Sequence, residues 1–582
     1  MTSNSEQRPA RTPPWAILPG TAGSLLRDLP VILGGVALLY GLLSLTRYWE
    51  SPVGTQPVID LNPSALPKYA LFSVARIAIA YLLSLSVAIA YGYVAAHNAK
   101  AERFLIPLLD TLQSIPVLSF LPGVMVAMVA LFPGKQLGVE LGSILLIFTG
   151  QVWNMAFSVY SSVKNIPREM REAARVYRFS RWQGLMDLEL PSAAIGLVWN
   201  SMMSVAGAWF FLMACEMFVL GNRDLRLPGL GSYLQTASNA GDTRAILWGL
   251  AGMILVIVLI DQFVWRPAIA WSEKFKLEQV EAAQQPHSFV LAWLRRSRVM
   301  SAVGRVSMAP LDERLSLLFA RRAPARQDQP SHARKRWVGR VVAIGGLLGL
   351  ASAIWKMSLM LATLTRSAMS GILTGAAYTF VRVEVTLLLA GLWTVPVGVL
   401  IGLRPRLAAA AQPLAQIAAS VPATALFPIL LLLLMRAGGG LGIGSILLML
   451  LGTQWYILFN VIAGASAIPT DLKEACDVFR ITQVNRWRHL FLPSIFPYLI
   501  TGFVTASGGA WNASIVAEYV HFRGQTISTT GLGAEISRAT DSGDFATLLG
   551  ATVVMAAMVV TFNRLVWRRL YGLASTRYKL ET

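Results

Sequence analysis

The chain has 582 residues, of which 55% are hydrophobic and 14% are charged, and its formal net charge is +20. The charged fraction is far below the roughly 25% of soluble domains, and the mean hydropathy is +0.56. This composition excludes an ordinary soluble domain and indicates a polytopic membrane protein. The basic residues are spread between apolar runs, which disfavours a nucleic-acid-binding surface.

Residues 1–29 are polar and contain proline and arginine, and no small-residue cleavage pattern follows the first apolar run, so we expect a cytoplasmic N-terminal tail. The apolar runs are long enough to cross a hydrocarbon core of roughly 30 Å. They should be helical, because lipid offers no hydrogen-bond partner to the backbone. Twelve spans are predicted, at 30–46, 69–95, 105–132, 141–162, 192–220, 245–266, 338–360, 376–402, 411–435, 441–464, 494–520 and 545–566.

These spans form two sets of six and predict an all-α protein with two six-helix halves, 30–268 and 338–568. A basic linker, 269–337, joins the halves, and a basic tail, 569–582, ends the chain. The positive-inside rule places the linker, both termini and the polar segment 163–191 in the cytoplasm. The net charge is then mainly a signal for topology and for anionic lipids.

The two halves are copies of one another. "EAARVYRFSRWQGLMDLELP" at 172–191 returns as "EACDVFRITQVNRWRHLFLP" at 474–493, an offset of 302 residues. "SIPVLSFLP" at 114–122 returns as "SVPATALFP" at 420–428, an offset of 306. These matches indicate a duplicated and fused gene. With an even number of spans in each half, the copies are parallel and related by an axis along the membrane normal.

The Glu-Ala…Leu-Pro blocks resemble the cytoplasmic loop of ABC importer permeases, and "SVARIAIAYLLS" and "SIPVLSFLP" resemble the nitrate/sulfonate/taurine-type branch of that family. The resemblance covers both halves, but not the N-terminal tail or the linker. It implies a type I importer permease (MetI-like) fold in each half and binding-protein-dependent import of a small anion. The matching loop residues are Glu172, Ala173, Ala174, Leu190 and Pro191, then Glu474, Ala475, Leu492 and Pro493, with Cys476 replacing the second alanine.

Each loop is predicted to be two short helices, with Ser180 as a candidate N-cap of the second helix in the first copy. The resemblance implies that these loops couple the chain to a separate ATPase. The family's glycine between the two helices is Arg178 here and Arg480 in the second copy. Because a left-handed backbone costs a non-glycine residue roughly 1–2 kcal/mol, we expect both turns to stay right-handed. An arginine there could also reach an acidic group of the ATPase.

The chain contains no G-x-x-x-x-G-K-[ST] phosphate loop and no histidine pair with metal-ligand spacing. We therefore expect a permease that is not an enzyme and that has no cofactor or metal of its own. ATP and Mg would be bound by two partner ATPase subunits, expected to be a homodimer. The resemblance also implies a periplasmic or extracellular binding protein that delivers the solute.

Six intramembrane residues are candidates for the substrate path or gate. Arginines in a membrane are functional candidates, unless they snorkel to the headgroups. Glu384, two residues from Arg382, is expected to offset the charge of that arginine. The glutamates could brace the gate or cap a helix, and the tryptophans could contact substrate or pack helices. The six residues are Arg76, Arg382, Glu216, Glu518, Trp209 and Trp511.

Two alternatives remain open from the sequence. A twelve-helix, ion-coupled secondary transporter has the same layout, but it has no reason to keep matched Glu-Ala…Leu-Pro loops. An ABC importer permease for a non-anionic small solute would keep them. Nothing in the sequence chooses among nitrate, a sulfonate, bicarbonate and an unrelated solute.

Overall fold

The computed structural model describes residues 58–220, 223–275, 288–296, 332–436 and 438–577, with a few positions between 28 and 49. The predicted first span, 30–46, therefore lies largely outside the described residues. The chain forms two compact units. The larger comprises 48–164, 199–258 and 327–582, and the smaller comprises 1–47, 165–198 and 259–326.

The first half is helical apart from one short hairpin, as far as the structure describes it. Its helices are α2 (Leu66–His97), α3 (Ala99–Ser114), α4 (Leu121–Leu131), α5 (Leu137–Lys164), α6 (Arg168–Val176), α7 (Arg181–Gln183), α8 (Leu190–Glu216), α9 (Leu230–Ala240), α10 (Thr243–Ile260), α11 (Arg266–Ser272) and α12 (Phe289–Arg296). The hairpin is formed by β1 (Val219–Leu220) and β2 (Arg223–Asp224).

The helices of the second half are α15 (His332–Ala362), α16 (Arg366–Gly402), α17 (Pro405–Ser420), α18 (Ala423–Arg436), α19 (Leu441–Ser466), α20 (Thr470–Val478), α21 (Gln483–Arg486), α22 (Leu492–Ala517), α23 (Leu532–Ser542), α24 (Phe545–Phe562) and α25 (Arg568–Arg577). In this half, α16 to α25 repeat the order of α2 to α11, and α15 precedes them. The hairpin of the second half pairs β3 (Tyr519–Phe522) with β4 (Gln525–Ser528).

The all-helical membrane architecture is confirmed, but the count of twelve spans is not. Among the described residues, eight helices are long and apolar enough to cross a membrane, or nine if one bent pair counts as a span. Four of the eight lie in each half. The predicted span 338–360 falls in α15, of which only Ala351–Ala362 forms a short apolar stretch. The predicted span 411–435 is divided between α17 and α18.

A proline breaks the helix at the same place in both halves. Residues Ala99–Ser114 and Val117–Leu131 meet at 84°, directly before and after Pro116. A proline pushes the preceding residue toward extended backbone, and Ile115 has ψ 126°. Val421, which precedes Pro422, has ψ 118°. The sequence matched these two prolines but did not predict that each would divide a span.

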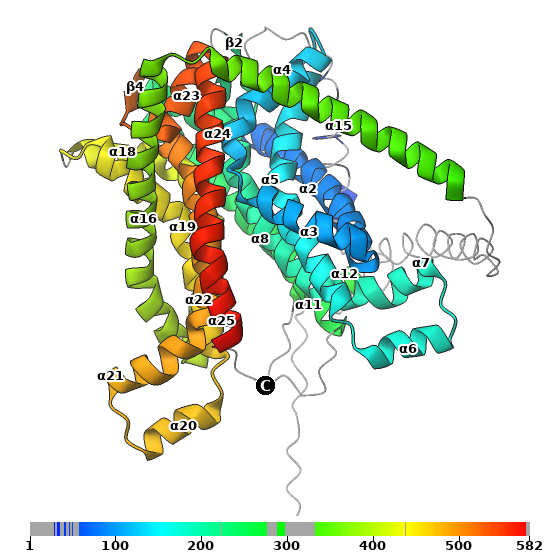
Figure 1. Cartoon of the computed structure of the whole chain (residues 1–582). Helices are drawn as coiled ribbons and strands as arrows, with labels where there is room; N and C mark the ends of the chain where they lie inside the picture. Colours follow the sequence, from blue (N-terminus) through cyan, green and yellow to red (C-terminus); the bar gives the residue numbers. More distant parts are fainter. Residues whose placement is uncertain are drawn as a thin grey trace, which may run out of the picture. The chain divides into compact units, whose positions relative to one another are not determined.

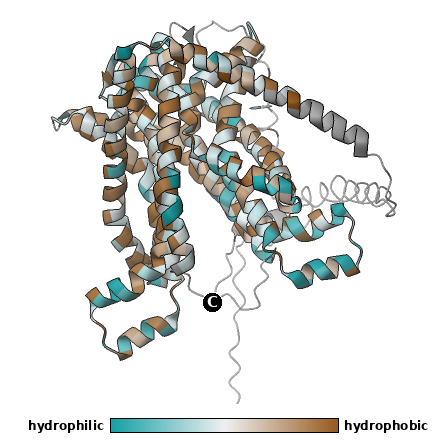
Figure 2. Ribbon diagram, viewed as in Figure 1, coloured by the Kyte–Doolittle hydropathy of each residue, from teal (hydrophilic) through white to brown (hydrophobic). Residues whose placement is uncertain are grey.

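Short π-helical turns also recur in both halves. They precede α8 at Gly184–Glu189 and α22 at Trp487–Phe491, and they follow α10 at Asp261–Trp265 and α24 at Asn563–Trp567. Figure 1 shows α16, α19, α22 and α24 side by side, and α19 packs along α22. Apolar residues colour these long helices in Figure 2, whereas α20 and α21 are more polar.

Candidate functional site

Arg76 of α2 lies at the centre of a buried charge cluster in the first half. Its Nε and Nη2 donate to the two carboxylate oxygens of Glu140, each at 2.7 Å. Its Nη1 donates to Glu216 Oε1 at 2.7 Å and to the Pro228 carbonyl at 2.9 Å. All three charged side chains are 0% exposed. The guanidinium therefore does not snorkel to a surface, and its hydrogen bonds are used inside the protein.

The second half builds the matching cluster with one carboxylate fewer. Arg382 of α16 donates to Glu518 Oε1 at 2.9 Å and to the Thr530 carbonyl at 2.6 Å. Its Nη2 reaches the Thr529 hydroxyl at 3.0 Å. The expectation that Glu384 would offset Arg382 is wrong, because the ion pair forms with Glu518 and Glu384 Oε1 has no hydrogen-bond partner.

Each of the two glutamates also caps the helix that follows the hairpin. Gly231 N–H donates to Glu216 Oε2 at 2.7 Å at the start of α9. Gly533 N–H donates to Glu518 Oε2 at 2.9 Å at the start of α23. A carboxylate is stabilised at a helix N-terminus by the free N–H groups and by the helix dipole. The glutamates therefore join the end of a long span to the next helix and to the arginine.

A hydroxyl completes each cap. Ser73 donates to Glu216 at 2.7 Å and accepts from the backbone of Leu230 at 3.0 Å. Thr379 does the same with Glu518 and Leu532, at 2.8 and 2.7 Å. Sequence reasoning missed these hydroxyls, although the offset of 306 residues that relates the two arginines also relates Ser73 to Thr379.

The Gly-Leu-Gly repeats leave room for the carboxylates. A Cβ at Gly229 would lie 2.2 Å from Glu216 Oε1, and one at Gly531 would lie 2.1 Å from Glu518 Oε2. No side chain fits at such distances. These glycines are therefore explained by the close approach of a glutamate.

The two matched tryptophans lie in the packed interior. Trp209 of α8 is 2% exposed and Trp511 of α22 is fully buried. The ring of Phe380 lies 6.4 Å from the ring of Trp511. Neither tryptophan, and none of the four charged candidates, is among the residues that line the two cavities described next.

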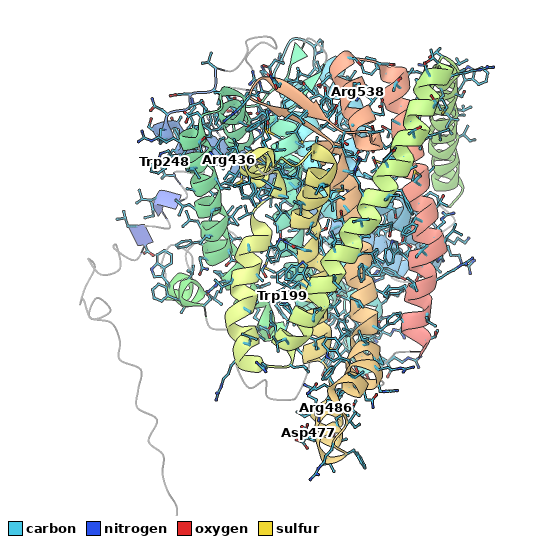
Figure 3. The ribbon with its side chains drawn as sticks, turned by 90° about the vertical axis from the view of Figure 1, so that its left-hand side faces the viewer. Trp199, Trp248, Arg436, Asp477, Arg486 and Arg538 are labelled. Atoms are coloured by element: carbon cyan, nitrogen blue, oxygen red, sulfur yellow. The ribbon has the colours of Figure 1, made fainter. Side chains whose placement is uncertain are left out.

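A cavity of about 460 Å³ lies between α8 and α19 in the larger unit. Its walls are mostly aromatic and aliphatic, and none of the residues that line it is Lys, Arg, His, Asp or Glu. Trp199 is the first of the α8 residues in its wall and is labelled in Figure 3. The wall includes Trp199, Met202, Met203, Phe210, Phe211, Gln416, Trp455, Tyr456, Phe459, Asn460 and Asn512.

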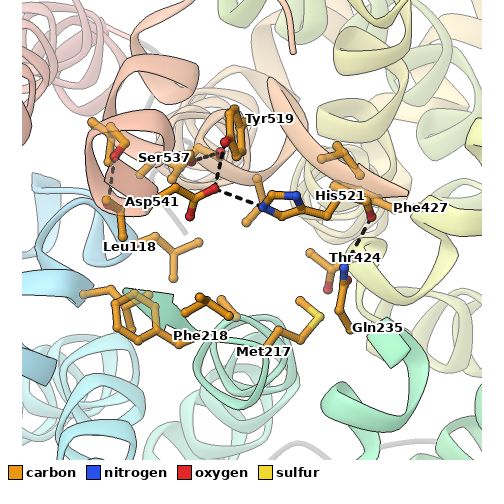
Figure 4. Close-up of a pocket in the computed structure, with 18 of the residues that line it drawn as sticks. Leu118, Met217, Phe218, Gln235, Thr424, Phe427, Tyr519, His521, Ser537 and Asp541 are labelled. Carbon is orange, nitrogen blue, oxygen red and sulfur yellow. Dashed lines mark hydrogen bonds and ion pairs between the residues drawn. The ribbon is translucent and has the colours of Figure 1, made fainter. Parts of the chain in front are cut away.

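A smaller cavity, of about 180 Å³, lies farther along α8 and α22, beside the β3–β4 hairpin. Figure 4 shows Tyr519, His521 and Asp541 together on one wall. Tyr519 donates to Asp541 Oδ2 at 2.7 Å, and His521 Nε2 lies 3.1 Å from the same oxygen. Burial, with the Asp541 carboxylate second, raises the pKa of Tyr519 to about 12.

The residues between the two cavities contact one another across the two halves. Leu118 N–H, beside Pro116, donates to Asn512 Oδ1 of α22 at 3.3 Å. The larger cavity includes Asn512, and the smaller one includes Leu118. The two cavities are therefore successive chambers along the same helices, with this contact at their boundary.

The first polar loop, residues 165–191, has the predicted pair of short helices. Ser180 is the N-cap of α7: its Oγ accepts from Gln183 N–H at 3.2 Å, and its own N–H donates to Gln183 Oε1 at 2.9 Å. This capping box confirms the candidate N-cap.

The second polar loop, residues 467–493, is fastened differently. Thr482 caps α21 without a side-chain hydrogen bond. Instead, Arg486 donates to the carbonyls of Ile481 at 2.9 Å and Cys476 at 3.1 Å. It also pairs with Asp477 at 2.7 Å, and Figure 3 labels these two charged residues together. Gly184 occupies the position of Arg486 in the first loop.

The expectation of a right-handed turn is wrong in both loops. Arg178 has φ 52° and Arg480 has φ 49°. In the first loop, Arg178 N–H donates to the carbonyl of Arg175 at 3.1 Å, and Phe179 N–H donates to that of Ala174 at 3.0 Å. The second loop repeats both bonds. This is the Schellman motif, in which a left-handed residue satisfies the last carbonyls of a helix. The backbone pairing overrides the cost of an arginine side chain.

The sequence-predicted loop residues divide between exposed and packed positions. Glu172, Ala173, Arg178, Glu474, Arg480 and Leu492 are exposed, Ala174, Leu190, Pro191, Ala475 and Pro493 are half-buried, and Cys476 is buried. Sequence reasoning missed the large apolar side chains next to the arginines. Tyr177 is 76% exposed and Phe479 is 77% exposed, at equivalent positions.

Comparison with known families gives two matched regions. Residues 85–264 and 394–577 each match the family described as "Binding-protein-dependent transport system inner membrane component". Together they cover more than half of the chain, one region in each half.

Individual relatives are similar at low identity. The nitrate import permease protein NrtB of Leptolyngbya laminosa is 26% identical over 192 residues, which are 33% of this chain and 64% of that protein. The bicarbonate transport system permease protein CmpB of Synechococcus elongatus is 24% identical over 208 residues, 36% of this chain and 68% of that protein. The aliphatic sulfonates transport permease protein SsuC of Bacillus subtilis is 24% identical over 207 residues, which are 35% of this chain and 70% of that protein. The first alignment spans just under two thirds of its relative.

Proposed function

Because the chain belongs to the family of inner membrane components of binding-protein-dependent transport systems, we propose that it is the fused permease subunit of an ATP-driven importer for a small solute. The family has no catalytic activity and no cofactor in the permease chain. The observation that carries the proposal is the duplicated polar loop, which has the same helix–turn–helix geometry and the same exposed tip in both halves.

The two loops couple the permease to two ATPase subunits. An exposed valine and an exposed aromatic residue lie side by side at each tip, Val176 with Tyr177 and Val478 with Phe479, each 76–77% exposed. Such side chains are suited to a hydrophobic groove on a partner. Because each tip carries a valine followed by an aromatic residue, we expect the same groove on both partners, which supports an ATPase homodimer.

The solute passes through the two chambers by alternating access. Closure of the ATPases would move the loops and hence the ends of α8 and α22 that follow them. The boundary contact between Leu118 and Asn512 would then open and close. The buried clusters of Arg76 and Arg382 brace the opposite ends of these helices. Both guanidinium groups already donate hydrogen bonds within the protein, which supports a structural role for Arg76 and Arg382 rather than contact with the substrate.

The proposed topology places the polar loops, both termini and the linker in the cytoplasm of a bacterial inner membrane. The two hairpins then face the periplasm, where the substrate-binding protein would dock. The excess of Lys and Arg in the loop and linker segments supports this orientation.

The proposed substrate class is small anions. Support comes from the similarity to permeases named for nitrate, bicarbonate and aliphatic sulfonates. The loops distinguish this proposal from an ion-coupled secondary transporter, which does not need a docking site for an ATPase.

The test is solute uptake in cells whose partner ATPase lacks its catalytic glutamate. We expect uptake to stop, and the double variant Tyr177→Asp and Phe479→Asp to lose both uptake and solute-stimulated ATP hydrolysis. A matched control is Tyr571→Asp, which replaces an exposed aromatic residue outside the loops. Uptake that continued with the inactive ATPase would favour a secondary transporter.

A further inference from the structure

The larger cavity has an unusual chemistry for a site that would receive small anions. Six aromatic side chains line it, three from α8 and three from α19: Trp199, Phe210, Phe211, Trp455, Tyr456 and Phe459. Its other walls include methionines and small residues, and no lining side chain carries a charge. An ion in this cavity would therefore find no opposite charge.

The polar groups in the wall are all uncharged, and its three amide side chains already donate hydrogen bonds within the protein. Gln416 Nε2 donates to Met202 Sδ at 3.1 Å. Asn460 Nδ2 donates to the carbonyl of Tyr456 at 2.8 Å, and Asn512 Nδ2 donates to that of Gly508 at 3.0 Å. Asn512 Oδ1 accepts from Leu118. An inorganic anion that left water here would lose its hydration without an equivalent set of donors, which is costly. The negative faces of aromatic rings would add to the cost.

The size of the cavity also fits a larger occupant. A dry, apolar protein cavity of roughly 150 Å³ is sufficient for benzene, and this one measures about 460 Å³. A flat ring can stack on, or lie edge-to-face with, several of the six aromatic side chains at once. Each such contact contributes beyond the burial of its area.

We propose that this cavity is a binding site for an organic solute with a planar aromatic body, and that inorganic anions are not bound there. The proposal rests on the permease function and specifies the substrate class more narrowly. An aromatic anion combines the ring that suits this cavity with the charge that the similarity to anion permeases suggests, and its head group would have to stay outside the apolar wall. Nitrate or bicarbonate offers only the charge.

The test is equilibrium binding to the purified full chain in lipid nanodiscs, without ATPase or binding protein. Four probes are compared: benzenesulfonate, benzamide, sodium nitrate and tetramethylammonium. We expect saturable binding of at least one of the two ring compounds and none of nitrate. Trp455→Leu should weaken ring binding at least tenfold, whereas Trp248→Leu, at an exposed tryptophan of α10 outside the cavity (Figure 3), should leave it unchanged.

Ala206→Phe, at another cavity position, provides a second variant that fills the space instead of enlarging it. It should abolish ring binding, and an unchanged unfolding midpoint shows that either variant is folded. Saturable nitrate binding that Trp455→Leu removes would overturn the proposal, and so would binding of tetramethylammonium alone. Binding of neither ring would also overturn it. The uptake test with an inactive ATPase remains independent of all these results.

Discussion

The two buried arginine clusters share one plan but differ in charge. In the first half, one guanidinium meets two carboxylates, and all three groups are fully buried. In the second half, Arg382 meets only Glu518 and is 11% exposed. The residue that corresponds to Glu140, at the repeat offset of 302 residues, is Gly442. In place of a second carboxylate, the Thr529 hydroxyl accepts a hydrogen bond from Arg382 Nη2.

This difference separates the part of the cluster that both halves share from the part that only the first half has. Both halves keep the arginine, the capping glutamate, the hydroxyl beneath it and the pair of glycines. Only the first half adds a second carboxylate. The common function is therefore to fasten the end of a long span to the helix behind the hairpin, and the second carboxylate only saturates the arginine further.

The largest expected effect comes from removing the arginines. Arg76→Met leaves two buried carboxylates without a counter-ion, and Arg382→Met leaves one. Loss of one partner from a buried pair costs about 3–5 kcal/mol, so we expect Arg382→Met to destabilise by this amount and Arg76→Met by more. The measurement is the unfolding midpoint in detergent. Arg436→Met, at the exposed end of α18 (Figure 3), is the control, and equal effects of the two cluster variants would contradict the charge comparison.

The glycines in front of the glutamates come next. Gly229→Ala and Gly531→Ala each place a methyl group about where a carboxylate oxygen lies, so the caps must shift. Overpacking of this kind typically costs about 1–3 kcal/mol. We expect similar losses in the two halves, measured by thermal unfolding. Gly508→Ala is the matched control, because nothing lies within 4 Å of its added Cβ, and a loss as large there would refute the explanation.

A smaller effect should separate the two halves. In the first half, Glu140→Gln keeps the shape of the side chain but removes the second carboxylate that binds Arg76. In the second half, Thr529→Val removes the hydroxyl that binds Arg382 where no second carboxylate is present. Each hydrogen bond to a charged group contributes about 1.5–3 kcal/mol. The glutamine variant weakens two such bonds, both from Arg76, whereas the valine variant removes one, from Arg382. The glutamine variant should therefore lower the unfolding midpoint more than the valine variant. The reverse order would show that the second carboxylate is not stabilising.

The smallest effect is expected in the loops. Arg178→Gly and Arg480→Gly remove a side chain from a left-handed position and should relieve roughly 1 kcal/mol of backbone strain, reduced by the greater freedom of glycine in the unfolded chain. Slower amide exchange at Phe179 and Ile481 would report the gain. Faster exchange would mean that the arginine side chains themselves hold the turns.

Sequence reasoning predicted the elements that depend on local patterns. The duplication, most of the long spans, the paired short helices of both loops and the Ser180 cap follow from periodicity and from residue type. The two arginines and the two glutamates were singled out, because charge is rare in spans, but they were not paired. Arg76 and Glu216 lie 140 residues apart, and nothing local indicates which ion pairs will form.

Other features had weaker signals or none. Glu140 was missed because it has no counterpart in the second half, so the repeat did not draw attention to it. The left-handed arginines were predicted to be right-handed because the cost of the side chain was known but the backbone hydrogen bonds were not. The walls of the larger cavity come from α8, α17, α18, α19 and α22, and only tertiary structure brings these segments together.

Each buried cluster draws all its members from a single half, since Ser73 to Gly231 and Thr379 to Gly533 do not overlap. A break introduced between residues 276 and 287 would therefore separate no arginine from its glutamates. The two fragments, produced as independent polypeptides, should each retain an intact brace and reassociate through contacts such as Leu118 with Asn512. Fusion into one gene would then ensure that the two halves are made in equal amounts, and it would not stabilise either half.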